Sequence, residues 1–445
     1  MKLYPFPEKK WVQVLLVGFL TALLLLARDT LITTCLVGFG KSQLLGMALV
    51  ALAGLTFVLW NRHRLKEILT DRRMVWAGVF ALALLGPMLI KRDWQLMYVS
   101  ILFCPLTAIL LSYFVSYQHL SKLNVCILSV LAGYSLLAAY VLKPMVMNGQ
   151  MTAPVFYNSQ NWDFYNFGLS FVVTWPTWFR NFGIFREPGV YQFFLVLGLY
   201  LNNYTVSWKR QWALWLVNGL LAITMVSTFS VAGLAVTALL VVFVYVDKRY
   251  YRTKAGKLAL ALAAVAVLVG GLGFWAILQG QSFGNSVFYE VYDMFLRLTS
   301  GSDSANDRLA AVITDLQAWL RHPIFGGSLA QVLHAAQHNT SSSLILLAAA
   351  GVLAGGLHIA SWAALVWDKK RCVIGNVCLL GILFLSFNTQ NLTADVFFWL
   401  IPVMALVQRS AACSCNKGGN KHGKTIAAQG SADPAGDCQR DQTGL

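Results

Sequence analysis

Apolar residues recur along this chain in runs of roughly 17 to 25 residues, close to the length that crosses a bilayer as a helix. Short polar segments separate most of these runs. The pattern predicts an all-α, polytopic membrane protein with about twelve transmembrane helices. The spans are expected at residues 11–27, 44–60, 74–90, 94–117, 123–142, 190–206, 212–226, 231–246, 258–278, 341–366, 373–387 and 396–407.

Two longer polar segments interrupt this pattern. Residues 143–189 are rich in Asn, Trp and Tyr, which suits a membrane interface. Within them, the apolar stretch 167–175 is too short to cross a bilayer and is expected to re-enter the membrane. Residues 1–407 should form a single membrane domain, whereas the polar, glycine-rich residues 408–445 are expected to be a disordered tail.

The longest polar segment, residues 279–340, contains a helical pattern. Its apolar positions recur every three or four residues, as expected for one face of a helix. They are Leu309, Val312, Ile313, Leu316, Trp319 and Leu320. The helix is too short to span a bilayer and should lie at the membrane surface. Arg308, Asp315 and Arg321 fall off the apolar face, and for Asp315 and Arg321 a solvated helix face is the preferred interpretation.

The charge distribution predicts the orientation of the chain. Only 12% of the residues are charged, against roughly 25% in soluble domains, and the net charge is +16. The basic residues gather in short loops on one side, which follows the positive-inside rule and not a nucleic-acid-binding pattern. Both termini are therefore expected in the cytoplasm. The segment 279–340, with five acids, three arginines and no lysine, would lie outside the cytoplasmic membrane.

Several classes of function are disfavoured by the residues that are missing. The eight cysteines include no CxxC pair, so a zinc site or a disulfide framework is not expected. No phosphate-binding loop of an ATP motor is present. No Asp, Glu, Lys or Arg lies in the middle of a predicted span, whereas ion-coupled transporters need such groups. We expect neither a bound metal nor a cofactor. The polar residues that could take part in a reaction are expected at the outer face of the membrane.

The first candidate site precedes the span at 190–206. Pro188 and Gly189 allow a turn into a helix start, where free N–H groups favour anions. Arg186 can grip a phosphate with two donors, and Arg180 lies nearby in the sequence. Glu187 is either a base or the partner of the arginine. The alternative interpretation is an interfacial arginine beside a helix-capping acid.

Two further candidates lie in the segment 279–340. Arg308 on the surface helix is suited to a lipid-linked pyrophosphate, although it also fits a solvated helix face. His338, just before the span at 341–366, can accept a proton from a sugar hydroxyl. His334 lies four residues earlier, a spacing that can bind a metal, but no third ligand is evident. Ordinary surface histidines remain the alternative.

Together these segments resemble the O-antigen ligase/polymerase superfamily, the Wzy-like and WaaL-like integral membrane glycosyltransferases. Three stretches carry the resemblance, which covers roughly residues 179–356. They are residues 179–191 (FRNFGIFREPGVY), the sequence from Arg308 through Trp319 to HPIFGG at 322–327, and His338-Asn339 followed by apolar residues to Gly351.

The resemblance implies a GT-C-like fold and a metal-independent glycosyltransferase that uses an undecaprenyl-pyrophosphate-linked glycan as donor. It implies that Arg186 and Arg308, supported by Arg180, bind the pyrophosphate. His338 would be the general base, with Glu187 as its rival. A flippase and a chain-length regulator are the protein partners implied, beside membrane lipid and the lipid-linked oligosaccharides.

Four functions stay open at this point. A polymerase of O-antigen, capsule or exopolysaccharide is the leading hypothesis. A ligase that transfers the glycan to lipid A core or another acceptor is its nearest rival. A polysaccharide exporter should carry charged residues along a central path, which these spans lack. A non-catalytic scaffold would not require arginines and a histidine at one face.

Overall fold

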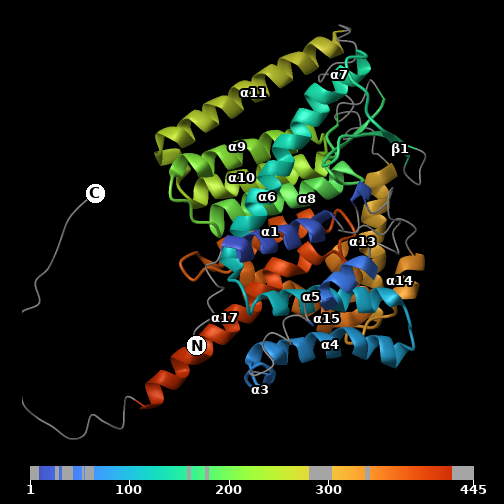
Figure 1. Ribbon diagram of the computed structural model, residues 1–445, viewed down its shortest axis with the longest axis vertical. Coiled ribbons are helices and arrows are strands. Elements are labelled where there is room, and N and C mark those ends of the chain that lie inside the picture. Colours follow the sequence, from blue (N-terminus) through green and yellow to red (C-terminus); the bar gives the residue numbers. More distant parts are fainter. Residues whose placement is uncertain are drawn as a thin grey trace, which may run out of the picture.

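The computed structural model describes residues 10–25, 30–32, 44–52, 55, 65–157, 162–175, 180–279, 303–335 and 341–422, and these residues are mostly helical. The helices labelled in Figure 1, with their neighbours, are α1 (Lys10–Leu25), α3 (Leu65–Leu69), α4 (Arg72–Lys91), α5 (Leu96–Leu111), α6 (Tyr117–Leu137), α7 (Lys143–Met147), α8 (Pro188–Tyr204), α9 (Gln211–Ser227), α10 (Val231–Asp247), α11 (Lys254–Leu278), α13 (Asp303–Arg321), α14 (Leu329–Ala335), α15 (Ser342–Val366), α16 (Val373–Phe387) and α17 (Val396–His422). A π-helical turn, η3 (Ala138–Leu142), joins α6 to α7, and a 3-10 turn, η4 (Tyr250–Arg252), precedes α11.

Three helical stretches in the described residues are long and apolar enough to cross a membrane: Arg72–Lys91, Tyr117–Met147 and Ser342–Val366. Six further apolar helices of 10–17 residues accompany them. Large apolar side chains face outward from these elements, for example Leu82 on α4 and Ile374 on α16. Such surfaces suit contact with lipid, since soluble proteins rarely expose large apolar patches. These helices confirm the all-α fold class predicted from the sequence.

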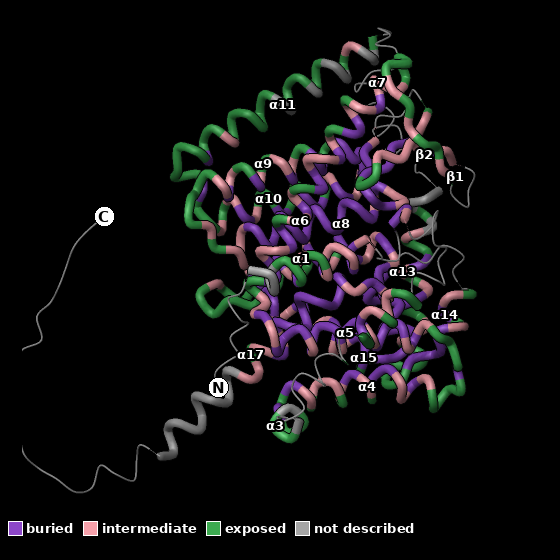
Figure 2. The backbone as a smooth tube through the Cα atoms, in the orientation of Figure 1, coloured by how far each residue is buried: buried purple, intermediate pink, exposed green. Residues whose placement is uncertain are grey.

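Most helices lie side by side, and their buried faces form one core (Figures 1 and 2). Helix α8 is buried along almost its whole length between α6, α9, α10 and α16. An aromatic cluster joins α8 to α15 and α17, with Phe193, Trp362 and Phe398 in edge-on or tilted contact. By contrast, α11 is largely exposed and lies at the edge of the molecule (Figure 2).

Helix α13 runs across the ends of the packed helices instead of alongside them (Figure 1). Its predicted apolar face points outward: Leu309 is 60% exposed and Leu320 is 69% exposed. The opposite face packs against α15, and there Asp315 is only 1% exposed. The solvated position predicted for Asp315 is therefore wrong, because the polar side of this helix faces the protein. Arg321 is exposed, as predicted.

A small antiparallel sheet caps the same end of the molecule. Strands β1 (Val155–Tyr157), β2 (Asp163–Asn166) and β3 (Phe171–Val173) pair in the order β1-β2-β3. Phe164 of β2 is paired with Val173 of β3, and both side chains are buried beside Phe182. The apolar stretch at 167–175 thus satisfies its backbone in a sheet, and the described part of the predicted re-entrant segment is not a membrane helix.

Helix α15 is broken at Gly351, whose φ is 72° and ψ is −170°. Ser343 Oγ and His358 Nδ1 lie 3.1 Å apart, although fifteen residues of a straight helix would separate them by about 22 Å. The half-helix before Gly351 therefore folds back against the half that follows it. The turn after α13 fills the break: Val352 N donates to Pro323 O at 2.8 Å, and Gly327 N donates to Ala348 O at 2.7 Å. The segment Ser342–Val366 is thus long and apolar enough for a span by composition, but it is not the single straight span predicted at 341–366, because it is divided in two at Gly351.

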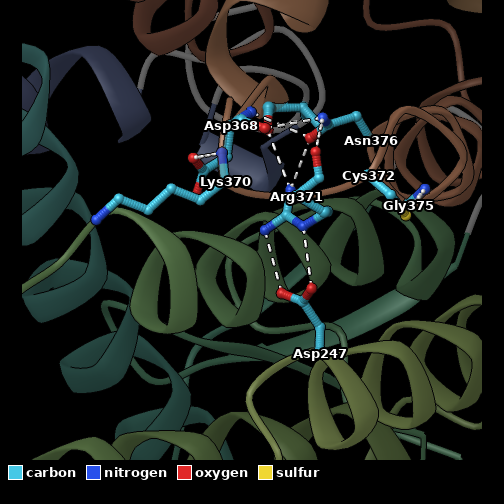
Figure 3. A network of polar contacts seen from close by, with 8 residues as sticks. Asp247, Asp368, Lys370, Arg371, Cys372, Gly375 and Asn376 are labelled. Carbon is cyan, nitrogen blue, oxygen red and sulfur yellow. Dashed lines mark hydrogen bonds and ion pairs between the residues drawn. The ribbon is translucent and has the colours of Figure 1, made fainter.

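At the opposite end, a polar network holds α10 to the segment between α15 and α16 (Figure 3). Arg371 donates from Nε and from a terminal nitrogen to the two oxygens of Asp247, at 3.1 and 3.2 Å. Asn376 accepts from both Arg371 and the Asp368 backbone. A paired arginine that also stacks on Tyr204 is explained by its structural contacts, so we assign this network a structural role.

Helix α17 continues beyond the predicted tail boundary at Gln408. The Gln408 amide donates to Val115 O at 2.8 Å, and Ser410 accepts from the Trp76 indole at 2.9 Å. These residues are therefore packed against the helical core. Helical backbone extends to His422, and residues 423–445 lie outside the described residues.

Candidate active site

The segment before α8 is fixed from several directions. Gly183 adopts a φ of +57°, and a Cβ at this position would lie 2.8 Å from the ring of Tyr191. Phe185 stacks on Phe194 with 4.5 Å between ring centroids. Leu31 N donates to Ile184 O at 2.8 Å, which ties the segment to a distant part of the chain. Arg186 and Glu187 thus project from a well-packed turn.

Glu187 occupies the N-cap position of α8, but its carboxylate makes no capping hydrogen bond. It lies 3.2 Å from the terminal nitrogen of Arg186 instead, and both side chains are about one-third exposed, at 38% and 35%. Glu187 is therefore not a hydrogen-bonding cap of α8, although it stands at the N-cap position. The ion pair fits the other interpretation, in which Glu187 is the partner of Arg186.

Arg308 is brought to this ion pair by α13. Its burial lowers the pKa of the guanidinium, and the nearby Glu187 carboxylate raises that pKa in opposition. An arginine stays protonated under such shifts because its unperturbed pKa is so high. The Glu187 carboxylate before α8 is thus near enough to Arg308 on α13 for their charges to interact.

The buried face of α13 also holds the start of α15. Ser341 Oγ donates to the Asp315 carboxylate, and Ser342 Oγ donates to the backbone oxygen of Gln390. Ser343 N donates to Asn388 Oδ1 at 3.0 Å. Helices α13 and α15 and the segment between α16 and α17 are thus joined by hydrogen bonds beside the start of α8. Asp315 positions this assembly from inside the protein.

Gln390 is a site residue that the sequence reasoning did not identify. Its side chain is 4% exposed, and its amide Nε2 has no hydrogen-bond partner among the described residues. A Cβ at Gly189, in the first turn of α8, would lie only 2.3 Å from this nitrogen. An unpaired buried donor is costly, so an acceptor on a bound ligand is a natural partner. The polar run at 388–391 between two apolar spans was the available signal.

The other predicted residues are placed differently. Arg180 donates from Nε to Thr228 O at 3.3 Å, which ties it to the turn between α9 and α10. His334 is exposed on α14. His338 lies outside the described residues, three positions before Ser341 in the sequence. Within the described ranges, no group of three or more His, Cys, Asp or Glu side chains is placed to hold a metal ion.

No family model, curated protein or solved structure matches this chain. The residues of the site therefore indicate its ligand. Guanidinium groups bind phosphate oxygens through paired donors, and helix N-termini add backbone N–H groups and a positive dipole. Arg186, Arg308, the start of α8 and the Gln390 amide together suit a di-anionic or more highly charged phosphate group.

Proposed function

We propose that this protein polymerises undecaprenyl-pyrophosphate-linked oligosaccharide units into a surface polysaccharide, at the outer face of the cytoplasmic membrane. The observation that carries the proposal is the charge interaction of Arg308 with Glu187, which is the ion-pair partner of Arg186. These residues belong to two of the three stretches that resemble the ligase/polymerase superfamily, and they lie far apart in the sequence. A shared phosphate ligand is a physical reason for two arginines to occupy one place.

The proposed topology has about twelve spans with both termini in the cytoplasm. Contacts within the described residues support it, because they join segments predicted on the same side. The segment at 388–392 bonds to the start of α15. The basic segment around Arg371 bonds instead to Asp247, at the opposite end of the packed helices.

In the proposed reaction, a hydroxyl of the acceptor glycan attacks the anomeric carbon of the donor. The bond between that carbon and the pyrophosphate oxygen breaks, and the carbon is inverted. Negative charge develops on the leaving lipid pyrophosphate, where Arg186 and Arg308 stabilise it and the Gln390 amide donates a hydrogen bond. Arg180, which precedes α8 and donates to Thr228 O on the turn between α9 and α10, supports the site.

The hydroxyl proton must pass to a base as the new glycosidic bond forms. His338 is the proposed base, since a neutral imidazole accepts protons near physiological pH. Glu187 is the rival, but its carboxylate is engaged in an ion pair with Arg186. In this proposal the arginines supply the positive charge, and no metal or nucleotide sugar takes part.

Deletion of the gene, followed by electrophoresis of the surface glycan and of the lipid-linked intermediates, tests this function. A polymerase predicts single repeat units on the carrier or on the surface, with no long ladder. A ligase predicts long chains that remain on the carrier and are absent from their surface acceptor. Unchanged glycans in the deletion strain would contradict the proposed function and favour an exporter or a scaffold.

A further inference from the structure

A second polar site lies between the end of α4 and the segment that follows α13. It is a hollow of about 320 Å³, at the lower end of the sizes of small-ligand pockets. Charged and polar residues dominate its lining. They include Lys91, Arg92, Asp93, His322, Gly327 and Gln331.

The walls of this hollow are held together by Asp93. Its Oδ2 accepts hydrogen bonds from Leu329 N at 2.7 Å and from Ala330 N at 3.2 Å, at the start of α14. Arg92 ends α4 in the left-handed conformation, with a φ of 52°, which turns the chain toward Asp93. The Asp93 carboxylate is thus engaged with backbone donors and buried, so the walls keep a fixed spacing.

The open side of the hollow is cationic. Lys91 and Arg92 are both exposed and carry positive charge, and His322 adds ring nitrogens. Gly327 forms part of the wall: a Cβ there would lie 3.4 Å from Gln331 Oε1 and 3.8 Å from His322 Cδ2. Gln331 and His322 therefore both lie beside this glycine. Two cations against one engaged carboxylate favour an anionic ligand.

Exposed apolar residues border the cationic hollow on both sides. Trp94, three residues after the end of α4, is 67% exposed. Leu89 and Ile90, in the last turn of α4, are exposed as well. Ile324 and Phe325 are exposed on the turn after α13. Tryptophan and apolar residues next to basic ones are typical of a membrane interface, where headgroups meet acyl chains. The ligand that matches these surroundings has an anionic head and an apolar tail.

This hollow is separate from the candidate active site. His322 follows the last residue of α13, and Arg308 lies fourteen positions earlier, near its start. At 1.5 Å per residue these positions are about 21 Å apart along the helix. A single phosphate group cannot reach both.

We propose that this hollow binds the phosphate headgroup of a membrane lipid, with the lipid tail along Leu89, Ile90 and Trp94. The proposal stands on the hollow alone and does not depend on glycan transfer. The same phosphate chemistry occurs in anionic phospholipids and in isoprenoid phosphates. Either lipid would also stabilise the turn at 323–327, which fills the break in α15 at Gly351.

Native mass spectrometry of the purified full-length protein tests this site. The probes are dioleoyl phosphatidylglycerol, undecaprenyl phosphate and, as a lipid without phosphate, dioleoylglycerol. The double variant Lys91→Gln, Arg92→Gln should bind at least one phosphate lipid roughly 30-fold more weakly than the wild type, because each cation near a membrane contributes about a fivefold effect. The lipid that loses affinity identifies the source of the phosphate.

The matched control is Lys209→Gln, Arg210→Gln, an exposed Lys-Arg pair before α9. It should leave binding of every probe unchanged. The single variant His322→Gln provides a milder test that keeps α4 intact, and it should weaken binding several-fold. Equal affinity of the wild type and both hollow variants for the two phosphate lipids would overturn the proposal. So would binding of dioleoylglycerol as tight as that of the phosphate lipids.

Discussion

The carboxylate of Glu187 lies close enough to the guanidinium of Arg308 to raise its pKa, against the lowering caused by burial. Glu187 precedes α8, whereas Arg308 lies on a helix that crosses the ends of the bundle. Glu187 also pairs with Arg186 at 3.2 Å, so its carboxylate pairs with one arginine and interacts electrostatically with the other. The positive charge of the pair exceeds the negative charge, which leaves this site suited to an anion.

Arg308→Lys keeps the charge but loses the planar pair of donors. We predict that glycan elongation falls roughly 100-fold, as when one donor to a developing oxyanion is removed, while the protein still inserts and folds. Elongation of lipid-linked glycan by membranes with equal amounts of protein measures this. The matched control, Arg321→Lys at the exposed end of the same helix, should keep wild-type activity. Full activity in Arg308→Ala would remove Arg308 from the site.

The two base candidates are separated by Glu187→Gln and His338→Ala. Because Glu187 is held in an ion pair, we predict that Glu187→Gln mainly raises KM by disturbing Arg186 and Arg308. His338→Ala should mainly lower kcat, by roughly 100-fold or more, which is typical of a lost general base. Kinetics of elongation against lipid-linked substrate measure both parameters. The opposite pattern would make Glu187 the base.

The Gln390 amide donates to the substrate in this account. Gln390→Leu should lower activity roughly 10- to 150-fold, since one hydrogen bond to a charged group is worth roughly 1.5–3 kcal/mol. Gln390→Glu should be worse, because it places a carboxylate where the pyrophosphate is expected. If Gln390→Glu elongates glycan as well as the wild type, the amide does not face the substrate. Gln211→Glu, at the exposed start of α9, is the matched control.

Gly351→Ala should unfold the junction between α13 and α15. A Cβ there would lie 2.1 Å from Ile324 O, and the φ and ψ at Gly351 belong to a region that is nearly restricted to glycine. We expect a lower thermal midpoint, by at least about 5 °C, and reduced activity. Gly356→Ala is the control, because its Cβ would meet only Val352 Cγ2 at 3.6 Å. Equal midpoints for the two variants would contradict the role of Gly351.

Apolar run length predicted helices well where a run was bounded by polar residues. The span predicted at 373–387 coincides with α16, and the amphipathic pattern at 309–320 lies within α13. The break at Gly351 could not be predicted in this way, because the apolar run continues through it. Its cause is a distant turn that hydrogen-bonds into the break.

The sequence drew attention to the charged residues of the candidate site but not to its neutral ones. Arg186 and Arg308 were selected from the stretches around them, and their roles stay predictions. Gln390 and Asp315 gain their roles only from packing: one lies against Gly189, and the other bonds to Ser341. The amphipathic pattern placed Asp315 on the polar face, but it could not show that this face is turned toward α15.

The central claim is tested most directly with purified protein and lipid-linked repeat units extracted from a strain that lacks the gene. The wild-type protein should convert single repeat units into a ladder of longer lipid-linked glycans, without nucleotide sugars and in the presence of a metal chelator. Arg308→Lys should yield almost no ladder, whereas Arg321→Lys should match the wild type. A failure of the folded wild-type protein to elongate these units, or equal ladders from Arg308→Lys, would contradict the account.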